Sequence, residues 1–290
     1  MVLFGLMSVV WGIPYLMIKV AVDGVSVPVL VFARTAIGAA ILLPLALRRQ
    51  YVPVLRKHWR PLVAFAAIEI IVPWFLLSDA EHHISSSMTG LLIAASPIVA
   101  VVLSRLTTAE RPSAVRWAGL AAGFAGVAVL AAPELRGGNP GAIAEVLLTA
   151  VCYAVAPLIA ARRLADVPAL PMTAVCLGLA ALVYTAPAAM TWPAELPAAR
   201  VLVALAGLAI VCTALAFVVF FALIREVGTT RALVFTYVNP AVAVTAGVLV
   251  LGEPLTPTIL ASFALILGGS VLATMRRDTA TAARLAAEPA

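Results

Sequence analysis

Long apolar stretches alternate with short polar segments along the whole chain. An apolar helix of about 20 residues crosses the hydrocarbon core of a bilayer, so each stretch of this length predicts one transmembrane helix. No basic segment precedes the first stretch, as it would in a signal peptide, and we expect a retained helix there. The ten predicted spans are residues 2–22, 26–47, 61–79, 84–104, 114–132, 141–161, 169–190, 199–221, 230–250 and 256–275.

The composition agrees with a chain that is surrounded by lipid. Of the 290 residues, 64% are hydrophobic and 11% are charged, whereas about a quarter of the residues in a soluble domain are charged. The predicted fold class is therefore an all-α integral membrane protein. The net charge of +6 does not indicate nucleic acid as a partner, because the basic residues fall in loops. The three cysteines lie in apolar stretches without CxxC spacing, so we expect packing rather than a disulfide, a metal site or a cofactor.

The two halves of the chain repeat each other. Pro97 and Pro240 are separated by 143 positions, and so are Glu110 and Glu253. A series of pairs with one offset and no gap indicates a duplicated unit. The same offset relates Pro14 to Pro157, Lys19 to Arg162, Asp23 to Asp166, Pro28 to Pro171, Pro44 to Pro187 and Gly126 to Gly269. The predicted organisation is a five-helix repeat at residues 1–133, a linker at 134–140, a second five-helix repeat at 141–275 and a cytoplasmic tail at 276–290.

Basic residues in the short loops predict the orientation in the membrane. The loop after the second span carries Arg48, Arg49, Arg56, Lys57 and Arg60, and the loops that alternate with it are also basic. Since cytoplasmic loops are enriched in Lys and Arg, both termini are expected in the cytoplasm. Five spans in each half is an odd number, so the two repeats are expected to be inverted. Inverted repeats around a site near the bilayer midplane are typical of secondary transporters.

Two charged residues inside the first half are candidates for a substrate or proton site. Glu69 lies near the middle of the third span, where a carboxylate costs at least ~2.5 kcal/mol. Arg34 lies at a similar depth in the second span, so the two side chains could meet. Their repeat equivalents, Leu177 and Cys212, are uncharged. Either Arg34 and Glu69 line a functional site or they form a buried ion pair that fixes helix packing.

Prolines within the spans mark further candidate positions. Pro97 and Pro240 lie in the middle of predicted helices, where each removes a backbone hydrogen bond and frees carbonyl groups that can bind a ligand. Pro14 and Pro157 are expected to do the same in the first and sixth spans. The alternative is that these prolines only shape the packing. The remaining candidates for the cavity lie beside the kinks or on the first span: Ser96, Tyr237, Asn239, Trp11 and Tyr15.

Small and charged residues near the helix ends predict packing. Glu110 and Glu253 are expected to cap the helices that follow them. The sequence from Gly119 to Gly123 is a GxxxG motif, which favours close helix contact inside the chain or, less readily, a homodimer face. His82 and His83 follow the third span, where a solvated turn is favoured over a pH sensor.

Several of these motifs occur together in one known family. The pattern formed by Trp11, Gly12, Tyr15 and Lys19, the Arg34 of the second span, and the proline-to-glutamate units that end at Glu110 and Glu253 resemble the drug/metabolite transporter superfamily, EamA type. The resemblance covers residues 1–275. It implies a ten-helix inverted-repeat exporter of amino acids or other small metabolites, with a central cavity. Glu69 is not a general position of that family.

The expected function is a secondary transporter of the cytoplasmic membrane that exports a small-molecule substrate by alternating access, coupled to protons, another ion or a substrate gradient. An enzyme is not expected, because the sequence contains no P-loop, hydrolase elbow or zinc-ligand cluster. A lipid or lipid-carrier flippase and a non-transporting membrane subunit are the alternatives.

Overall fold

The computed structural model describes residues 2–107, 113–228 and 232–274, and the described part contains helices and turns without strands. Ten helical segments are long and apolar enough to cross a membrane, which confirms the predicted fold class. The segments are Val2–Val22, Val27–Ala46, Trp59–Ala80, Ser86–Leu103, Ala114–Gly137, Pro140–Arg163, Ala169–Met190, Ala199–Val227, Val234–Leu251 and Pro257–Thr274. The predicted cytoplasmic tail at 276–290 lies outside the described residues.

Five spans are single helices, and the structure extends two of them beyond the predicted bounds. The single helices are α3 (Val27–Ala46), α9 (Ala114–Gly137), α10 (Pro140–Arg163), α11 (Ala169–Met190) and α16 (Pro257–Thr274). Because α9 continues to Gly137, most of the predicted linker at 134–140 is helix. Asn139 accepts the Ala142 N–H and begins α10, so that only two residues separate the helices. A short helix, α4 (Val52–Lys57), lies in the basic loop after α3.

Three spans are broken where the sequence places a proline. The first consists of α1 (Val2–Val10) and α2 (Pro14–Val22), the fourth of α7 (Ser86–Ile93) and α8 (Ser96–Thr107), and the ninth of η4 (Leu233–Tyr237) and α15 (Asn239–Leu251). Proline lacks the N–H that the preceding turn requires, which explains the breaks at Pro14, Pro97 and Pro240. Pro157 lies inside α10, which continues through it, so the sixth span is not interrupted at its proline.

The third and eighth spans each contain a π-helical segment. In the third span, η2 (Ala67–Ile71) separates α5 (Trp59–Ala66) from α6 (Val72–Ala80). In the eighth, η3 (Gly207–Leu215) separates α12 (Ala199–Ala206) from α13 (Ala216–Val227). The repeat offset carries residues 67–71 onto 210–214, inside η3. Segments of π-helix occur frequently at functional sites.

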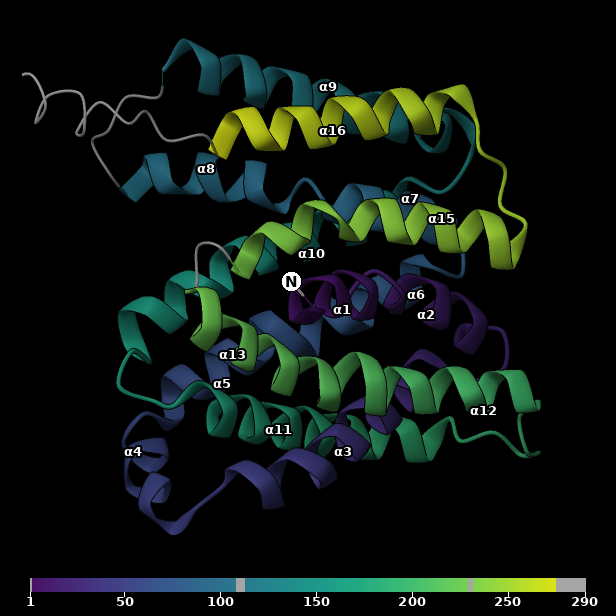
Figure 1. The fold of residues 1–290 in the computed structure, drawn as a ribbon. Helices are drawn as coiled ribbons and strands as arrows, with labels where there is room; N and C mark the ends of the chain where they lie inside the picture. The colour runs from purple at the N-terminus through teal and green to yellow at the C-terminus, as the bar shows by residue number, and fades with distance from the viewer. Residues whose placement is uncertain (1, 108–112, 229–231, 275–290) are drawn as a thin grey trace, which may run out of the picture.

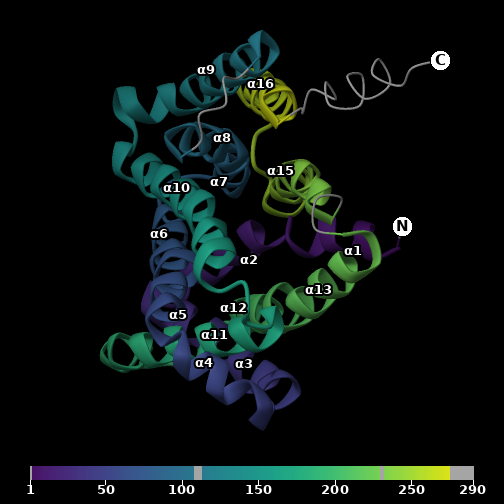
Figure 2. The ribbon, with the colours of Figure 1, turned by 90° about the vertical axis from the view of Figure 1, so that its left-hand side faces the viewer.

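The spans run side by side, with α2 in the interior of the bundle (Figures 1 and 2). This helix packs against α3, α6, α7, η3, α12 and α15, which come from both halves of the chain. Helices α9 and α16 pair along one side of the bundle, and α3 and α11 pair along the other. We refer to the two ends of the bundle as the α4 end and the Glu253 end, the latter containing the turns at 81–85 and 252–256.

The glycines of α9 and α16 allow these helices to touch. A Cβ atom on Gly119 would clash with the backbone of Gly269 and Ala273, and one on Gly269 would clash with the backbone of Gly123. The GxxxG motif is therefore used for packing inside the chain, as the sequence predicted. Large apolar side chains such as Leu182 (72% exposed) and Leu249 (77% exposed) point outward, as a surface in contact with lipid requires.

Candidate substrate site

Arg34 is buried where helices from both halves meet. Its guanidinium lies over the ring of Trp74 on α6, with Cζ 3.7 Å from the ring centroid. Its Nε donates a hydrogen bond of 2.9 Å to Oγ1 of Thr213, which lies in η3 of the second half. The Thr213 hydroxyl in turn donates to the main-chain oxygen of Leu208, 2.8 Å away. The cation–π contact and the charged hydrogen bond offset part of the cost of burying the cation.

Two tyrosines complete the surroundings of this cation. Tyr15 on α2 and Tyr153 on α10 both interact electrostatically with Arg34. Tyr15 is 9% exposed, and the Tyr153 hydroxyl lies next to the Trp74 side chain. We call the set formed by Tyr15, Arg34, Trp74, Tyr153 and Thr213 the Arg34 cluster. One cation, three aromatic rings and several hydroxyl groups suit a small anion that also carries an apolar part.

Glu69 does not pair with Arg34. Within the described residues no ion pair joins the two side chains, so the interpretation as a buried ion pair is wrong. Glu69 lies in η2 and interacts electrostatically with Cys176 on α11 and with Cys152 and Tyr153 on α10. An α-helix advances 100° per residue, so the wider turn of η2 changes the direction in which Glu69 points relative to Trp74. Tyr153 interacts electrostatically with both Arg34 and Glu69.

Trp11 and Asn239 lie at the breaks of the first and ninth spans. The Trp11 ring packs against Phe217, Phe220 and Phe235, with centroids 5.7, 4.9 and 5.4 Å away. The amide nitrogen of Asn239, in the orientation that satisfies its surroundings, donates to Ser8 O at 3.1 Å and to Phe235 O at 3.2 Å. Pro240 is buried beside it at the start of α15. These contacts join α1 to the second half, and they are separate from those of the Arg34 cluster.

The other predicted cavity residues use their polar groups for contacts within the protein. The Ser96 hydroxyl donates to Ile93 O at 2.6 Å, across the break that precedes Pro97. The Tyr237 hydroxyl lies 2.6 Å from Oγ1 of Thr274 on α16. Neither side chain has a described contact with the Arg34 cluster.

Sequence reasoning missed Thr213 and Tyr153 as members of the site. Both are polar side chains inside apolar spans, and that position was the signal that could have identified them. The sequence also offered no reason to place Trp74 beside Arg34. Its contact with Arg34 depends on how α6 is rotated after η2, which hydropathy does not report.

Glu253 caps a helix of the opposite half. Its carboxylate accepts the Ser86 N–H at 2.7 Å, the Ser86 hydroxyl at 2.9 Å, the Ser87 N–H at 3.0 Å and the Ser87 hydroxyl. The predicted role as cap of the following helix was wrong, because Thr256 caps α16 by accepting the Ile259 N–H. Gly252, with φ of +67°, turns the chain back toward α7, and Gly247 leaves room for the carboxylate. Glu110, the repeat equivalent, lies outside the described residues.

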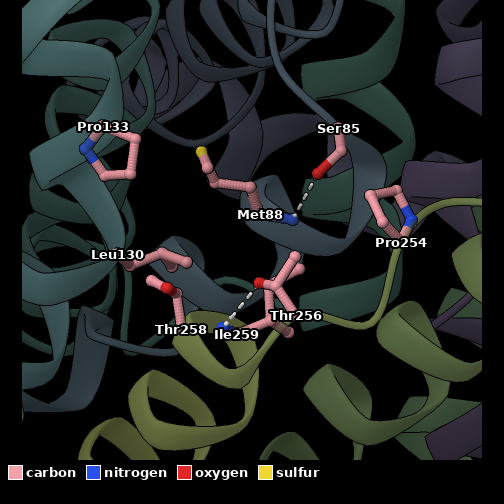
Figure 3. Close-up of a pocket in the computed structure, with 8 residues that line it drawn as sticks. All are labelled: Ser85, Met88, Leu130, Pro133, Pro254, Thr256, Thr258 and Ile259. Carbon is pink, nitrogen blue, oxygen red and sulfur yellow. Dashed lines mark hydrogen bonds between the residues drawn. The ribbon is translucent and has the colours of Figure 1, made fainter.

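A small hollow lies beside this cap at the Glu253 end (Figure 3). Its volume is about 270 Å³. Its walls are largely apolar and come from α7, α9, the segment that leads into α16 and the first turn of α16, with no member of the Arg34 cluster. The lining residues are Ser85, Met88, Leu130, Pro133, Pro254, Thr256, Thr258 and Ile259.

Known proteins resemble this chain along nearly its whole length. The uncharacterized transporter YvbV of Bacillus subtilis (strain 168) is 25% identical to this chain. The alignment covers 98% of this chain and 94% of the YvbV chain. The uncharacterized inner membrane transporter YedA of Escherichia coli (strain K12) is 29% identical over 92% of this chain and 88% of its own. A protein of Streptantibioticus cattleyicolor, named as a probable terminal-alkyne amino-acid exporter, is 26% identical over 92% of this chain and 91% of its own.

A crystal structure of another protein shares the fold. It superposes with a TM-score of 0.68 at 22% sequence identity and covers 94% of this chain and 96% of that chain. The ten spans and the inner-membrane relatives show a multi-pass protein of the cell membrane. The model of the EamA-like transporter family matches twice, at residues 1–132 and 141–275. The chain therefore belongs to the EamA-like transporter family, within the drug/metabolite transporter superfamily.

Proposed function

We propose that the protein is a secondary transporter that exports amino acids or similar small metabolites by alternating access. The observation that carries this proposal is the position of Arg34, a buried cation held between Trp74 of the first half and Thr213 of the second. A movement of one half against the other changes the surroundings of this cation. Such a movement can expose a site between the halves first to one side of the membrane and then to the other.

The proposed topology has two inverted repeats with both termini in the cytoplasm. The two family matches, at 1–132 and 141–275, each span five of the ten helices. The basic residues around α4 favour the α4 end as the cytoplasmic end. The Glu253 end is then the external end, and export runs from the α4 end to the Glu253 end.

The proposed substrate is a zwitterion with an apolar side chain. Arg34 binds the carboxylate, since a guanidinium can donate two parallel hydrogen bonds to that group. Glu69 binds the ammonium group, and Tyr153, which interacts with both charged residues, lies between the two ends of the substrate. The amino-acid exporter among the relatives supports this class. The other predicted cavity residues have packing roles in this state, and we propose that they line the path of the substrate beside the breaks in the first, fourth and ninth spans. These residues are Trp11, Ser96, Pro97, Tyr237, Asn239 and Pro240.

Two measurements test the proposal. Mass spectrometry of medium and cytosol from a bacterial host compares the wild type, the Glu69→Gln variant and an empty vector. We expect an amino acid to accumulate outside and to fall inside for the wild type only. In sealed proteoliposomes, the same amino acid should exchange with its labelled form, and Arg34→Gln should abolish the exchange while Arg200→Gln, at an exposed surface position, leaves it unchanged. Exchange that lipid headgroups inhibit and amino acids do not would contradict the proposal and indicate a flippase.

A further inference from the structure

Glu81 is a buried carboxylate at the Glu253 end of the bundle. It follows the last residue of α6 in the turn at the Glu253 end and is 0% exposed. Within the described part of the chain, neither of its carboxylate oxygens is hydrogen-bonded. A carboxylate in this position is costly when it is ionised, and neutralisation by a proton removes most of the cost.

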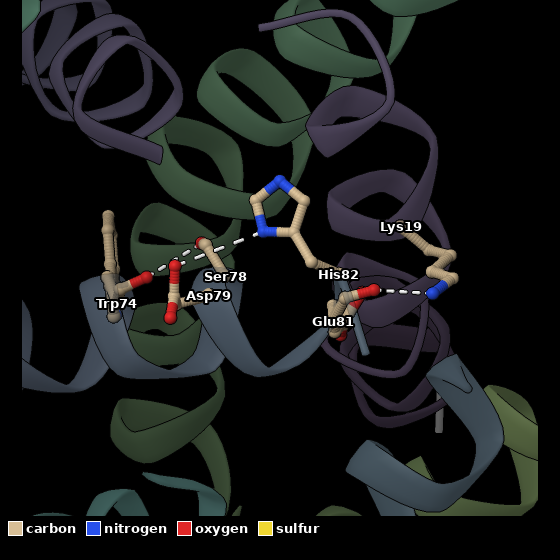
Figure 4. Close-up of polar contacts among 6 residues, drawn as sticks. All are labelled: Lys19, Trp74, Ser78, Asp79, Glu81 and His82. Carbon is tan, nitrogen blue, oxygen red and sulfur yellow. Dashed lines mark hydrogen bonds and ion pairs between the residues drawn. The ribbon is translucent and has the colours of Figure 1, made fainter. Parts of the chain in front are cut away.

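Lys19 fixes the turn that carries Glu81. Its Nζ donates to the main-chain oxygen of Glu81 at 2.5 Å (Figure 4). It also donates to the main-chain oxygen of Ile84 at 2.9 Å. Both bonds go to main-chain carbonyls, and the ammonium group acts electrostatically on the Glu81 carboxylate without a described hydrogen bond to it. The turn is thereby held on α2, the helix at the centre of the bundle.

Charged and titratable groups face Glu81 from three other elements. Tyr15 and Lys19 face it from α2, Arg34 from α3, and Glu253 from the segment before α16. Burial raises the pKa of Glu81 well above its ordinary value, and the Glu253 charge acts in the same direction. The cations Lys19 and Arg34 lower that pKa, but burial has the largest effect.

On its own segment, Glu81 is flanked by three titratable groups with accessible side chains, which are Asp79, His82 and His83. Asp79 and His82 lie 4.0 Å apart, and their side chains are 38% and 36% exposed. Both point away from the Lys19 contact (Figure 4). They provide matched controls, because they carry ionisable side chains close to Glu81 in the chain without sharing its burial.

We propose that Glu81 is a proton-binding site that couples the protonation of the protein to opening of the Glu253 end. In the state described here this end is closed by contacts between the halves, which include Glu253 with Ser86 and the 2.7 Å contact between the hydroxyls of Ser26 and Thr191. Separation of the halves admits water to Glu81, which then loses its proton and pairs with Lys19. When the Glu253 end closes again, the water is expelled and Glu81 takes up a proton.

The sign of the pH effect follows from the two states. The pKa of Glu81 is raised in the closed state, and exposure to water brings it toward the ordinary glutamate value of ~4.3. Protonation therefore favours the closed state, fully so below the pKa of the open state. This preference is lost as the pH rises through the pKa of the closed state. This pH dependence is expected of the protein without bound substrate, so it does not depend on which substrate is carried.

Distances between two spin labels test this proposal on the full chain in lipid nanodiscs. The labels are attached to cysteines at the exposed positions His83 and Glu195, one in each half, after Cys152, Cys176 and Cys212 have been replaced. In the protein with native Glu81 we expect a longer distance to gain population as the pH rises from 4.5 to 9, with a midpoint above ~4.3. In Glu81→Gln, which cannot ionise, only the shorter distance should be present at every pH.

The controls separate Glu81 from its neighbours. Asp79→Asn and His82→Gln should each keep the response of the protein with native Glu81, and Glu81→Asp, which still ionises, should keep a pH response with a shifted midpoint. A distance that does not change with pH when Glu81 is present would overturn the proposal, as would a full response in Glu81→Gln. Loss of the response in His82→Gln would assign the titration to the exposed pair instead. Failure of amino-acid exchange alone would contradict the proposed function and leave the coupling intact.

Discussion

The Glu253 carboxylate accepts the main-chain N–H of Ser86 at 2.7 Å, although the two residues are 167 positions apart. The carboxylate occupies the N-terminus of α7, where free N–H groups and the helix dipole favour a negative charge. The contact joins the last turn between spans to the fourth span. It is one of the polar links that hold the two halves together at the Glu253 end.

Loss of this cap should weaken the folded protein. We expect Glu253→Ala to lower the free energy of unfolding by about 1–3 kcal/mol, because four donors on Ser86 and Ser87 lose a charged acceptor. The melting temperature of the purified protein in detergent provides the measurement. Glu195→Ala, at an exposed position of another turn, is the matched control and should melt as the wild type does.

Two adjacent glycines of α16 should respond oppositely to the same change. Gly269→Ala places a methyl group against the backbone of α9, and we expect a loss of about 1–3 kcal/mol. The methyl group of Gly268→Ala would have no atom within 4 Å among the described neighbours, and we expect the free energy of unfolding to rise by up to about 1 kcal/mol from helix propensity. Thermal unfolding of both variants checks this. Equal melting temperatures would contradict the close contact of α9 with α16.

Arg34→Lys should reduce transport even though the charge is kept. A lysine has no Nε–H at the guanidinium position and cannot reproduce the planar stack on Trp74 while it bonds to Thr213. We expect kcat/KM for amino-acid exchange to fall by about 10–100-fold, which corresponds to a charged hydrogen bond. Thr213→Val should give a smaller decrease through the same contact. The control is Arg200→Lys, because the Arg200 side chain is 71% exposed. A decrease of similar size in this control would refute the role assigned to Arg34.

The absence of a described ion pair between Arg34 and Glu69 predicts weak energetic coupling. In a double-mutant cycle of Arg34→Gln and Glu69→Gln, the interaction energy in thermal unfolding should lie within about 0.5 kcal/mol of zero. A coupling of 2 kcal/mol or more, on the order of a directly contacting pair, would show that the two charges meet in the membrane.

The sequence was sufficient to predict the elements of this fold but not the partners of its buried side chains. Hydropathy predicts the length of each span, and Pro14, Pro97 and Pro240 predict where the first, fourth and ninth spans are interrupted. The rotation of a helix about its axis is different, because one extra residue in a π turn moves every later side chain by about 100°. For this reason Trp74 as the partner of Arg34, and the place of Glu69 beside α10 and α11, required the structure.

The π-helical segments of the third and eighth spans have a mechanical consequence. Each holds an extra residue within a helix whose two ends are fixed by turns on opposite sides of the bundle. When the wide turn moves along the helix by one position, the direction of the interior side chains changes while the length of the span stays the same. Glu69 and Thr213 lie on these two segments, so the carboxyl group proposed to bind the substrate and the hydroxyl group that holds Arg34 can be reoriented without unfolding either span.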